Sequence, residues 1–195
     1  MELRPLRPPH AVIGAKVLLA ALLLCGALFP NVGGFEGKGM AFRLPIFLAP
    51  SLIVPVRWWR RRGIYPVALD VALTVPFLLD TAANAVGLYD HFDPTDDVLH
   101  FVNWLVLVGG IALTWWLAPA TRDAPRWLVW AAAAGFGAAA IIVWEAGEYA
   151  VMRAGVGGLS LTYGDTIGDL LVSTTGGAIG AWVVIALAAR SAPAP

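Results

Sequence analysis

Six long apolar segments most constrain what this chain can fold into. Each approaches the roughly 20 residues that a helix needs to cross the hydrocarbon layer of a bilayer. Only 13% of the 195 residues are charged, whereas soluble domains carry about 25%, and the mean hydropathy is +0.74. The sequence therefore predicts an all-α, polytopic membrane helix bundle that forms a single integral membrane domain, 1–195. The expected spans are 11–29, 39–56, 64–88, 97–118, 126–150 and 165–189.

The distribution of basic residues predicts how these spans are oriented. If the N-terminus is cytoplasmic, ten of the 13 Lys and Arg residues fall in cytoplasmic pieces. The outer pieces hold only Lys38, Arg43 and Arg153. This bias follows the positive-inside rule. We therefore expect an N-in/C-in protein of a bacterial cytoplasmic (inner) membrane, with 1–10 as a cytoplasmic N-terminal segment and 191–195 as a disordered cytoplasmic tail.

The second segment is the weakest of the six candidates. It contains Pro45, Pro50 and Pro55, which predict a helix that is kinked or partly unwound. Charge supports the crossing, because without it the basic run 57–62 would move to the outside. We expect Asp70 to pair with an arginine of this run.

Composition also excludes several classes of function. The formal net charge is zero, so there is no electrostatic argument for a nucleic-acid partner. Cys25 is the single cysteine, which excludes an internal disulfide and a thiolate metal cluster within one chain. Because Cys25 lies in an apolar run, we expect a buried, inert thiol. The oligomeric state is open.

Acidic side chains gather in those halves of the later spans that are expected to lie at the outer face. The third span contributes Asp80 and Asn84, and the fifth ends with a pair of glutamates. Partners within a set are mostly three or four residues apart, which places them on one helix face. The other members are Asp93, Asp96, Asp97 and His100 of the fourth span, Glu145 and Glu148 of the fifth, and Asp165 and Asp169 of the sixth.

Helix capping accounts for some of these acids but not for all. Asp96 and Asp165 lie near expected helix N-termini, where a carboxylate caps free amides and meets a favourable dipole. Glu145 and Glu148 lie toward a helix C-terminus, where the dipole disfavours anions. Asp169 is a full turn inside its helix. These three acids therefore require another explanation.

Several carboxylates that converge in a low dielectric repel each other, so either some are protonated or a cation lies among them. Arg153 is the one fixed cation that we place near them, and it cannot neutralise the set. Oxygen ligands with one imidazole suit magnesium, calcium, manganese, iron or zinc. We therefore predict a divalent metal site, with a proton or ion relay and structural polar packing as the alternatives. The predicted ligands are Asp96, His100, Glu145, Glu148, Asp165 and Asp169, and possible pocket members are Asp80, Asn84 and Asp97.

Three of these elements resemble a known family. The stretch DDVLHF (96–101) resembles an element of VanZ-like membrane proteins, and WEAGEY (144–149) resembles the Glu-x-x-Glu element of the related YjdF-type inner-membrane proteins. The stretch GDTIGDLLVSTTGGAIG (164–180) resembles the segment that follows. The elements occur in the expected order and cover roughly residues 90–182.

The sequence departs from the VanZ pattern at three positions. Asp97 stands where lysine is common, Glu148 where glutamine is common, and Ser173 where asparagine is common. These departures favour the YjdF type and a more acidic site. VanZ is associated with resistance to the glycopeptide antibiotic teicoplanin. The resemblance therefore implies a family and site positions, but no reaction.

Three functions remain in competition. In a membrane enzyme, the metal would activate water or bind a phosphate of a lipid or polyprenyl headgroup in the outer leaflet, with His100 or Glu148 as general base. In a proton- or cation-coupled transporter, the acids would bind and release the transported ion. In a non-catalytic factor of envelope or antibiotic response, the acids would hold the helices in register.

Overall fold

The computed structural model describes residues 8–61, 63–121, 123–158 and 161–190. All secondary structure in these residues is helical, and six helical segments are long and apolar enough to cross a membrane. The predicted all-α polytopic bundle is therefore confirmed, and the chain is a multi-pass membrane protein. Most of the predicted N-terminal segment (1–7) and the predicted tail (191–195) lie outside the described residues.

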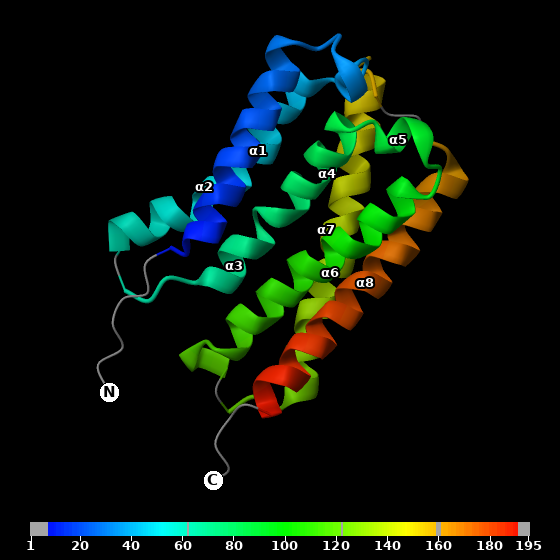
Figure 1. Cartoon of the computed structure of the whole chain (residues 1–195). Helices are drawn as coiled ribbons and strands as arrows, with labels where there is room; N and C mark the ends of the chain where they lie inside the picture. Colours follow the sequence, from blue (N-terminus) through cyan, green and yellow to red (C-terminus); the bar gives the residue numbers. More distant parts are fainter. Residues whose placement is uncertain (1–7, 62, 122, 159–160, 191–195) are drawn as a thin grey trace.

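The helices run up and down along one another, so that successive loops alternate between the two ends of the bundle (Figure 1). The start of α1 and the end of α8 lie at the same end, as an even number of spans requires. The long helices are α1 (His10–Leu28), α2 (Met40–Arg61), α6 (Thr95–Trp116), α7 (Arg126–Arg153) and α8 (Tyr163–Arg190). The third span consists of α3 (Val67–Ala72) and α4 (Val75–Ala85), and the connections hold α5 (Leu88–His91) and two 3-10 turns (Gly33–Phe35 and Pro119–Thr121).

Proline interrupts the third span rather than the second. Helix α2 is continuous through its three prolines, so the partial unwinding that the sequence allowed is not found there. The third span is instead broken at Leu73 and Thr74, just before Pro76. The ring of a proline clashes with the carbonyl of the residue four positions earlier. For Pro76 that residue is Ala72, where α3 ends.

A polar network fills the interior beside this break. Asp70 is fully buried, and it accepts hydrogen bonds from Lys16 Nζ at 2.7 Å and from the Tyr65 hydroxyl at 2.5 Å. Lys16 also donates to Thr74 Oγ1 at 2.9 Å and to the Ser51 carbonyl. The expected pairing of Asp70 with an arginine of the run 57–62 is therefore wrong as far as the described arginines go. Lys16 of α1 reaches Asp70 through the interior, whereas the described arginines of that run are exposed.

Small residues let α6, α7 and α8 pack closely around the main core. A Cβ atom at Gly176 or Gly180 would overlap the backbone carbonyl of Phe101 or Leu105. The close helix contact that this Gly-x-x-x-Gly pair predicts is thus present between α8 and α6. It sets the distance between the helices that carry His100 and the two aspartates of α8.

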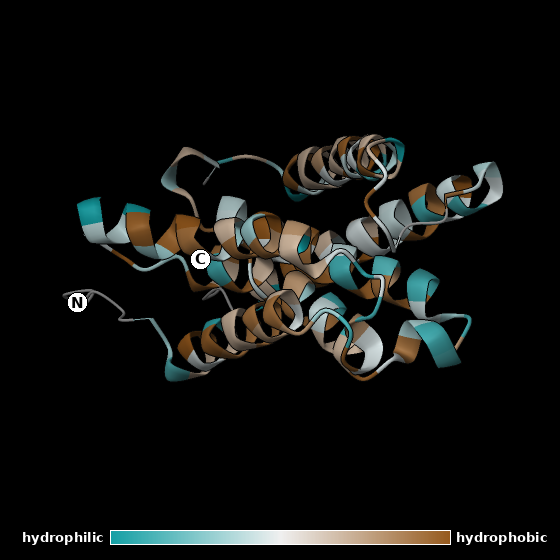
Figure 2. Ribbon diagram, turned by 90° about the horizontal axis from the view of Figure 1, so that it is seen from above, coloured by the Kyte–Doolittle hydropathy of each residue, from teal (hydrophilic) through white to brown (hydrophobic). Residues whose placement is uncertain are grey.

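The outer surface of the bundle is apolar, as a lipid environment requires. Hydrophobic residues recur along all the long helices (Figure 2), and many large ones are exposed, among them Val17, Leu28 and Trp59. Cys25 is exposed on this surface, so the prediction of a buried thiol is wrong. Apart from Lys16, the middle of α1 is apolar on every side, so its hydrophobic pattern does not tell which face packs inward. Lys16 marks that face, because it reaches Asp70 in the interior.

Candidate functional site

A polar pocket lies at the end of the bundle opposite the start of α1. Its volume is about 320 Å³, and residues of α2, α4, α6, α7 and α8 line it. The topology of the spans predicted that acids from four of them gather at one end, and acids from α4, α6, α7 and α8 do line this pocket. The lining side chains that carry the chemistry are Asp80, Asn84, Asp96, His100, Glu148 and Asp165.

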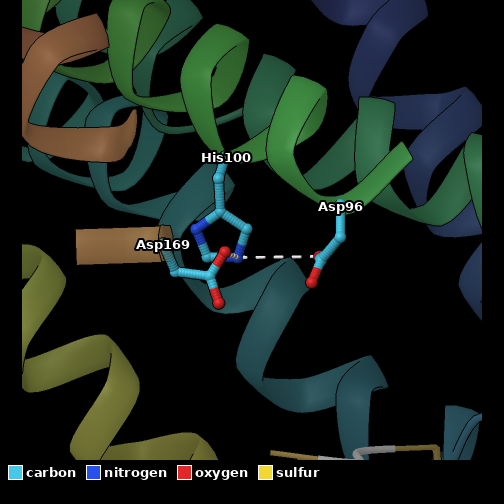
Figure 3. Close-up of side chains that lie close together, drawn as sticks. All are labelled: Asp96, His100 and Asp169. Carbon is cyan, nitrogen blue, oxygen red and sulfur yellow. Dashed lines mark ion pairs between the residues drawn. The ribbon is translucent and has the colours of Figure 1, made fainter. Parts of the chain in front are cut away.

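His100 lines this pocket and lies close to Asp96 and Asp169 (Figure 3). Its Nδ1 is 3.0 Å from Ser173 Oγ, which fixes the ring. Its Nε2 is 3.7 Å from Asp96 Oδ1 and 3.7 Å from Asp169 Oδ1. These separations are too long for hydrogen bonds. They fit two ligands that each bind one ion at about 2 Å, which lie roughly 3–4 Å apart.

The two glutamates of α7 approach the same imidazole. Ligand atoms of His100, Glu145 and Glu148 all lie within 4.8 Å of one another, and so do those of Asp96, His100 and Asp169. Both groups share His100 and could hold a metal ion.

Glu145 is the most unusual member of these groups. Its residue is only 5% exposed. Neither carboxylate oxygen makes a hydrogen bond of good geometry to a described residue, although the Thr166 side chain of α8 lies near enough for a weaker one. Leaving a buried polar group unpaired is costly, and for a charged group the penalty is larger. A native protein usually satisfies such a group with an ion or an ordered water. Asn103 Oδ1, also buried without a partner in the described chain, belongs to a residue that lines the same pocket.

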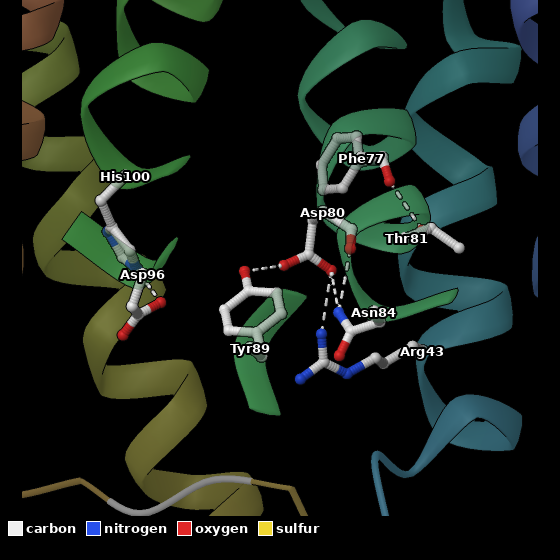
Figure 4. Close-up of polar contacts among 8 residues, drawn as sticks. All are labelled: Arg43, Phe77, Asp80, Thr81, Asn84, Tyr89, Asp96 and His100. Carbon is white, nitrogen blue, oxygen red and sulfur yellow. Dashed lines mark hydrogen bonds and ion pairs between the residues drawn. The ribbon is translucent and has the colours of Figure 1, made fainter. Parts of the chain in front are cut away.

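Asp80 has its partners within the protein (Figure 4). It accepts hydrogen bonds from Arg43 Nη1 at 2.9 Å and from the Tyr89 hydroxyl at 2.6 Å. Asn84 Nδ2 lies 3.3 Å from the same carboxylate. Burial, together with the negative charge of Asp80, raises the pKa of Tyr89 above its ordinary value. The phenol therefore stays protonated and keeps donating its hydrogen bond to Asp80. Asp80 thus lines the pocket with its hydrogen bonds already made within the protein.

The sequence-based prediction named the wrong cation for this pocket. We placed Arg153 next to the acids, but Arg153 is exposed. The cations that line the pocket are Arg43, which pairs with Asp80, and Lys38, which pairs with Asp90. The signal was available, because a charged residue inside an apolar span usually faces a partner or a cavity. Tyr89 and Asn103 offered no comparable signal, and Ser173 was named only as a departure from the VanZ pattern.

Five of the six predicted ligands belong to the two groups that share His100: Asp96 and Asp169 form one group with it, and Glu145 and Glu148 form the other. Asp165 lines the same pocket but belongs to neither group. Asp80 and Asn84 line it as well. Asp97 is exposed on α6 and is not a lining residue.

Two tryptophans form the apolar wall of the pocket. Trp104 stacks on His100 with 6.1 Å between ring centroids, and its Nε1 donates to the Gly137 carbonyl at 3.1 Å. Trp144 meets Trp104 edge to face at 6.3 Å. These rings lower the local polarity around His100, which strengthens electrostatic interactions there.

Comparison of the chain with family models, with curated proteins and with solved structures gave no match.

Proposed function

We propose that this chain is a VanZ-like membrane protein of the YjdF type whose acidic pocket binds a divalent metal ion and acts on a phosphate-containing lipid headgroup. The observation that carries the proposal is the buried carboxylate of Glu145, which makes no hydrogen bond of good geometry and lies beside two overlapping groups of ligands. The order of the three sequence elements supports the family.

The donor set fits a hard or borderline metal ion. Four carboxylates and one imidazole offer many oxygens and one nitrogen, the ligands that such ions prefer. Asp96, His100, Glu145 and Asp169 would hold the ion. When bound, a divalent metal lowers the pKa of a coordinated water and polarises a phosphoryl oxygen.

The remaining groups have supporting tasks. Ser173 holds the His100 ring in one orientation, as the second nitrogen of a metal-binding histidine usually requires. Glu148 is the proposed general base, because it lines the polar pocket and also the cavity beside it. A substrate that enters from either space meets this carboxylate.

The proposal includes a location. The bias of basic residues puts the pocket at the extracytoplasmic face of a bacterial inner membrane. A substrate headgroup in the outer leaflet would then lie at the depth of the pocket. The function belongs to envelope metabolism.

One observation favours proton- or cation-coupled transport as a second candidate. The inner half of the bundle also contains an ionisable network, Lys16 with Asp70 and Tyr65, next to the break in the third span. Broken helices with polar side chains are common at the binding sites of transporters. A transporter needs a polar route through the membrane, and the sequence did not reveal one. This network supplies part of such a route.

Metal binding by two matched variants tests the proposal. Asp169→Asn should abolish tight binding of Mn²⁺ or Zn²⁺ to the purified protein, measured by calorimetry and by metal analysis after dialysis. Asp97→Asn removes the same charge from an exposed position and should bind as the parent does. If the parent binds neither ion, or if both variants bind equally, the metal site is refuted. Metal-free protein that takes up cations into vesicles in a pH-coupled manner would establish transport instead.

A further inference from the structure

An apolar groove runs beside the polar pocket, between α2 and α7. Its volume is about 310 Å³, near the lower end of the roughly 300–1,000 Å³ of small-molecule sites. Side chains on both sides of the groove are open to the outside: Phe42 is 41% and Val143 is 73% exposed. Both residues lie in membrane-spanning helices, so the groove opens to the hydrocarbon layer.

Glycine-rich loops close the groove at its outer end. Residues 37–39, before α2, pack against residues 156–158, after α7. A Cβ atom at Gly158 would come within 2.7 Å of Lys38 Cα, and one at Gly157 within 2.8 Å of the Gly37 carbonyl oxygen. Gly39 has φ +61°, which other residues rarely adopt. The two loops therefore hold the ends of α2 and α7 together, and the groove is accessible from the side.

Charge is confined to one end of this groove. Lys38 and Arg43 line it there, together with Glu148, and the rest of the lining is apolar or glycine. Lys38 Nζ is 2.6 Å from Asp90 Oδ1. Arg43 uses Nη1 for Asp80, and a guanidinium has five N–H donors in total. Aspartates thus orient both cations, which keep donors for a ligand.

The groove and the polar pocket are adjacent and share lining residues. Both are lined by Arg43, Phe47, Trp104, Trp144 and Glu148. A molecule with a hydrocarbon chain in the groove would therefore have its polar end at Arg43 and next to the acids.

We propose that this groove holds one hydrocarbon chain of an anionic glycerophospholipid, with the lipid phosphate at Lys38 and Arg43. The lateral opening admits a chain directly from the bilayer, and the two cations at the outer end match a phosphate. This inference rests on the proposed function, because the acids around the pocket repel an anion unless a metal ion neutralises them.

A matched pair of glycine substitutions in α7 tests the groove. A Cβ atom at Gly147 or at Gly135 meets no other atom within 4 Å, but only Gly147 lines the groove. Gly147→Phe should weaken binding of dioleoylphosphatidylglycerol by at least about tenfold, or 1.4 kcal/mol. Gly135→Phe should leave it unchanged. Binding is measured by titrating the detergent-purified protein with this lipid and counting bound lipid by native mass spectrometry. Equal binding by the two variants overturns the proposal.

Chemical blocking after folding provides a second test, which a folding defect cannot affect. In a Cys25→Ser background, Val143→Cys places a thiol in the groove, and Ile142→Cys places one on the adjacent, exposed position outside it. Alkylation with N-benzylmaleimide should block lipid binding in the first protein only. Blocking in neither protein, or in both, contradicts the groove.

The headgroup is tested with Arg43→Gln. The parent should bind dioleoylphosphatidylglycerol more tightly than dioleoylphosphatidylcholine, and the variant should lose that preference. A parent protein that binds a polyprenyl phosphate but not the phospholipid overturns our choice of lipid.

Metal analysis of the same samples separates the two proposals. Metal bound without any lipid would refute the groove and leave the metal site intact. Lipid binding that depends on Gly147 in a protein without metal would refute the proposed function and leave the groove.

Discussion

Two carboxylates buried at opposite ends of the bundle contrast sharply. Asp70 is fully buried and receives hydrogen bonds from Lys16 and Tyr65. Glu145 is almost as deeply buried, yet neither of its oxygens makes a hydrogen bond of good geometry to a described residue, and Thr166 is near enough only for a weaker one. Both lie in apolar, membrane-spanning helices, where an unpaired charge is costly.

The difference lies in what the protein supplies around each acid. Around Asp70 it supplies a cation and a phenol, and burial together with the bond to Asp70 raises the pKa of Tyr65, so the phenol remains a donor. Around Glu145 it supplies more acids and a histidine. A satisfied network is typical of structure, whereas an unsatisfied buried acid is protonated or is paired with an ion or an ordered water. We therefore assign Asp70 to stability and Glu145 to binding.

The largest expected effect is on stability at Asp70. Asp70→Asn should lower the free energy of unfolding by about 3–5 kcal/mol, because it leaves the Lys16 ammonium without its ion-pair partner in the interior. Metal binding at the other end should not change. Thermal unfolding in detergent and metal titration of the same samples measure both. The double variant Lys16→Met/Asp70→Asn should recover much of the loss, and no recovery would show that the pair is not the cause.

Most of the fold could be predicted from the sequence, because a helix that crosses the bilayer must be apolar over about 20 residues. Apolar length identified six crossings, and spacing within each acidic pair put its members on one helix face. Prediction from the sequence failed where the contact depended on which side chain reaches across the bundle. Asp70 meets Lys16 of α1, 54 positions away, and the pairing of Arg43 with Asp80 is equally non-local.

The intermediate effect tests the outer acids at Glu145. Glu145→Gln keeps the shape of the side chain and removes a charge. Metal affinity should therefore fall by about a hundredfold, which is the largest loss typical for mutation of a side chain that only supports a metal ligand. Without metal, its stability should equal or exceed that of the parent, because repulsion between the acids is relieved. This sign is opposite to that expected for Asp70→Asn.

Excess metal sharpens this contrast. A ligand at a hundred times its dissociation constant stabilises the folded state by about 2.7 kcal/mol. The parent should gain this stabilisation, and Glu145→Gln should lose most of it under the same conditions. Unchanged metal content with raised stability would remove Glu145 from the metal site and favour the structural or proton-relay interpretation.

The candidate site was less readable than the fold. The motifs named the acids and His100, but not the groups that hold or surround them. Ser173 lies on α8 73 positions from His100, and no local pattern distinguishes it from the adjacent threonines. Whether Trp104 and Trp144 line a cavity or face lipid depends on the rotation of their helices, which apolar sequences leave undefined.

The smallest expected effect is at Ser173, which contacts the proposed ligand His100 but is not itself a proposed ligand. If Nε2 of His100 binds the metal, then Nδ1 carries the proton and donates it to Ser173 Oγ. Ser173→Ala removes the acceptor, so the ring loses its fixed orientation, and metal affinity should fall by about tenfold. Stability should fall by only about 1 kcal/mol, as for a typical hydrogen bond. Thr175→Ala, an exposed position on the same helix, is the matched control and should change neither quantity. Titration of both variants with metal, next to thermal unfolding without it, separates the two effects. A loss of stability in Ser173→Ala with unchanged metal affinity would mean that Ser173 supports the bundle as Asp70 does. The functional role at this end of the bundle would then not extend beyond His100 to Ser173.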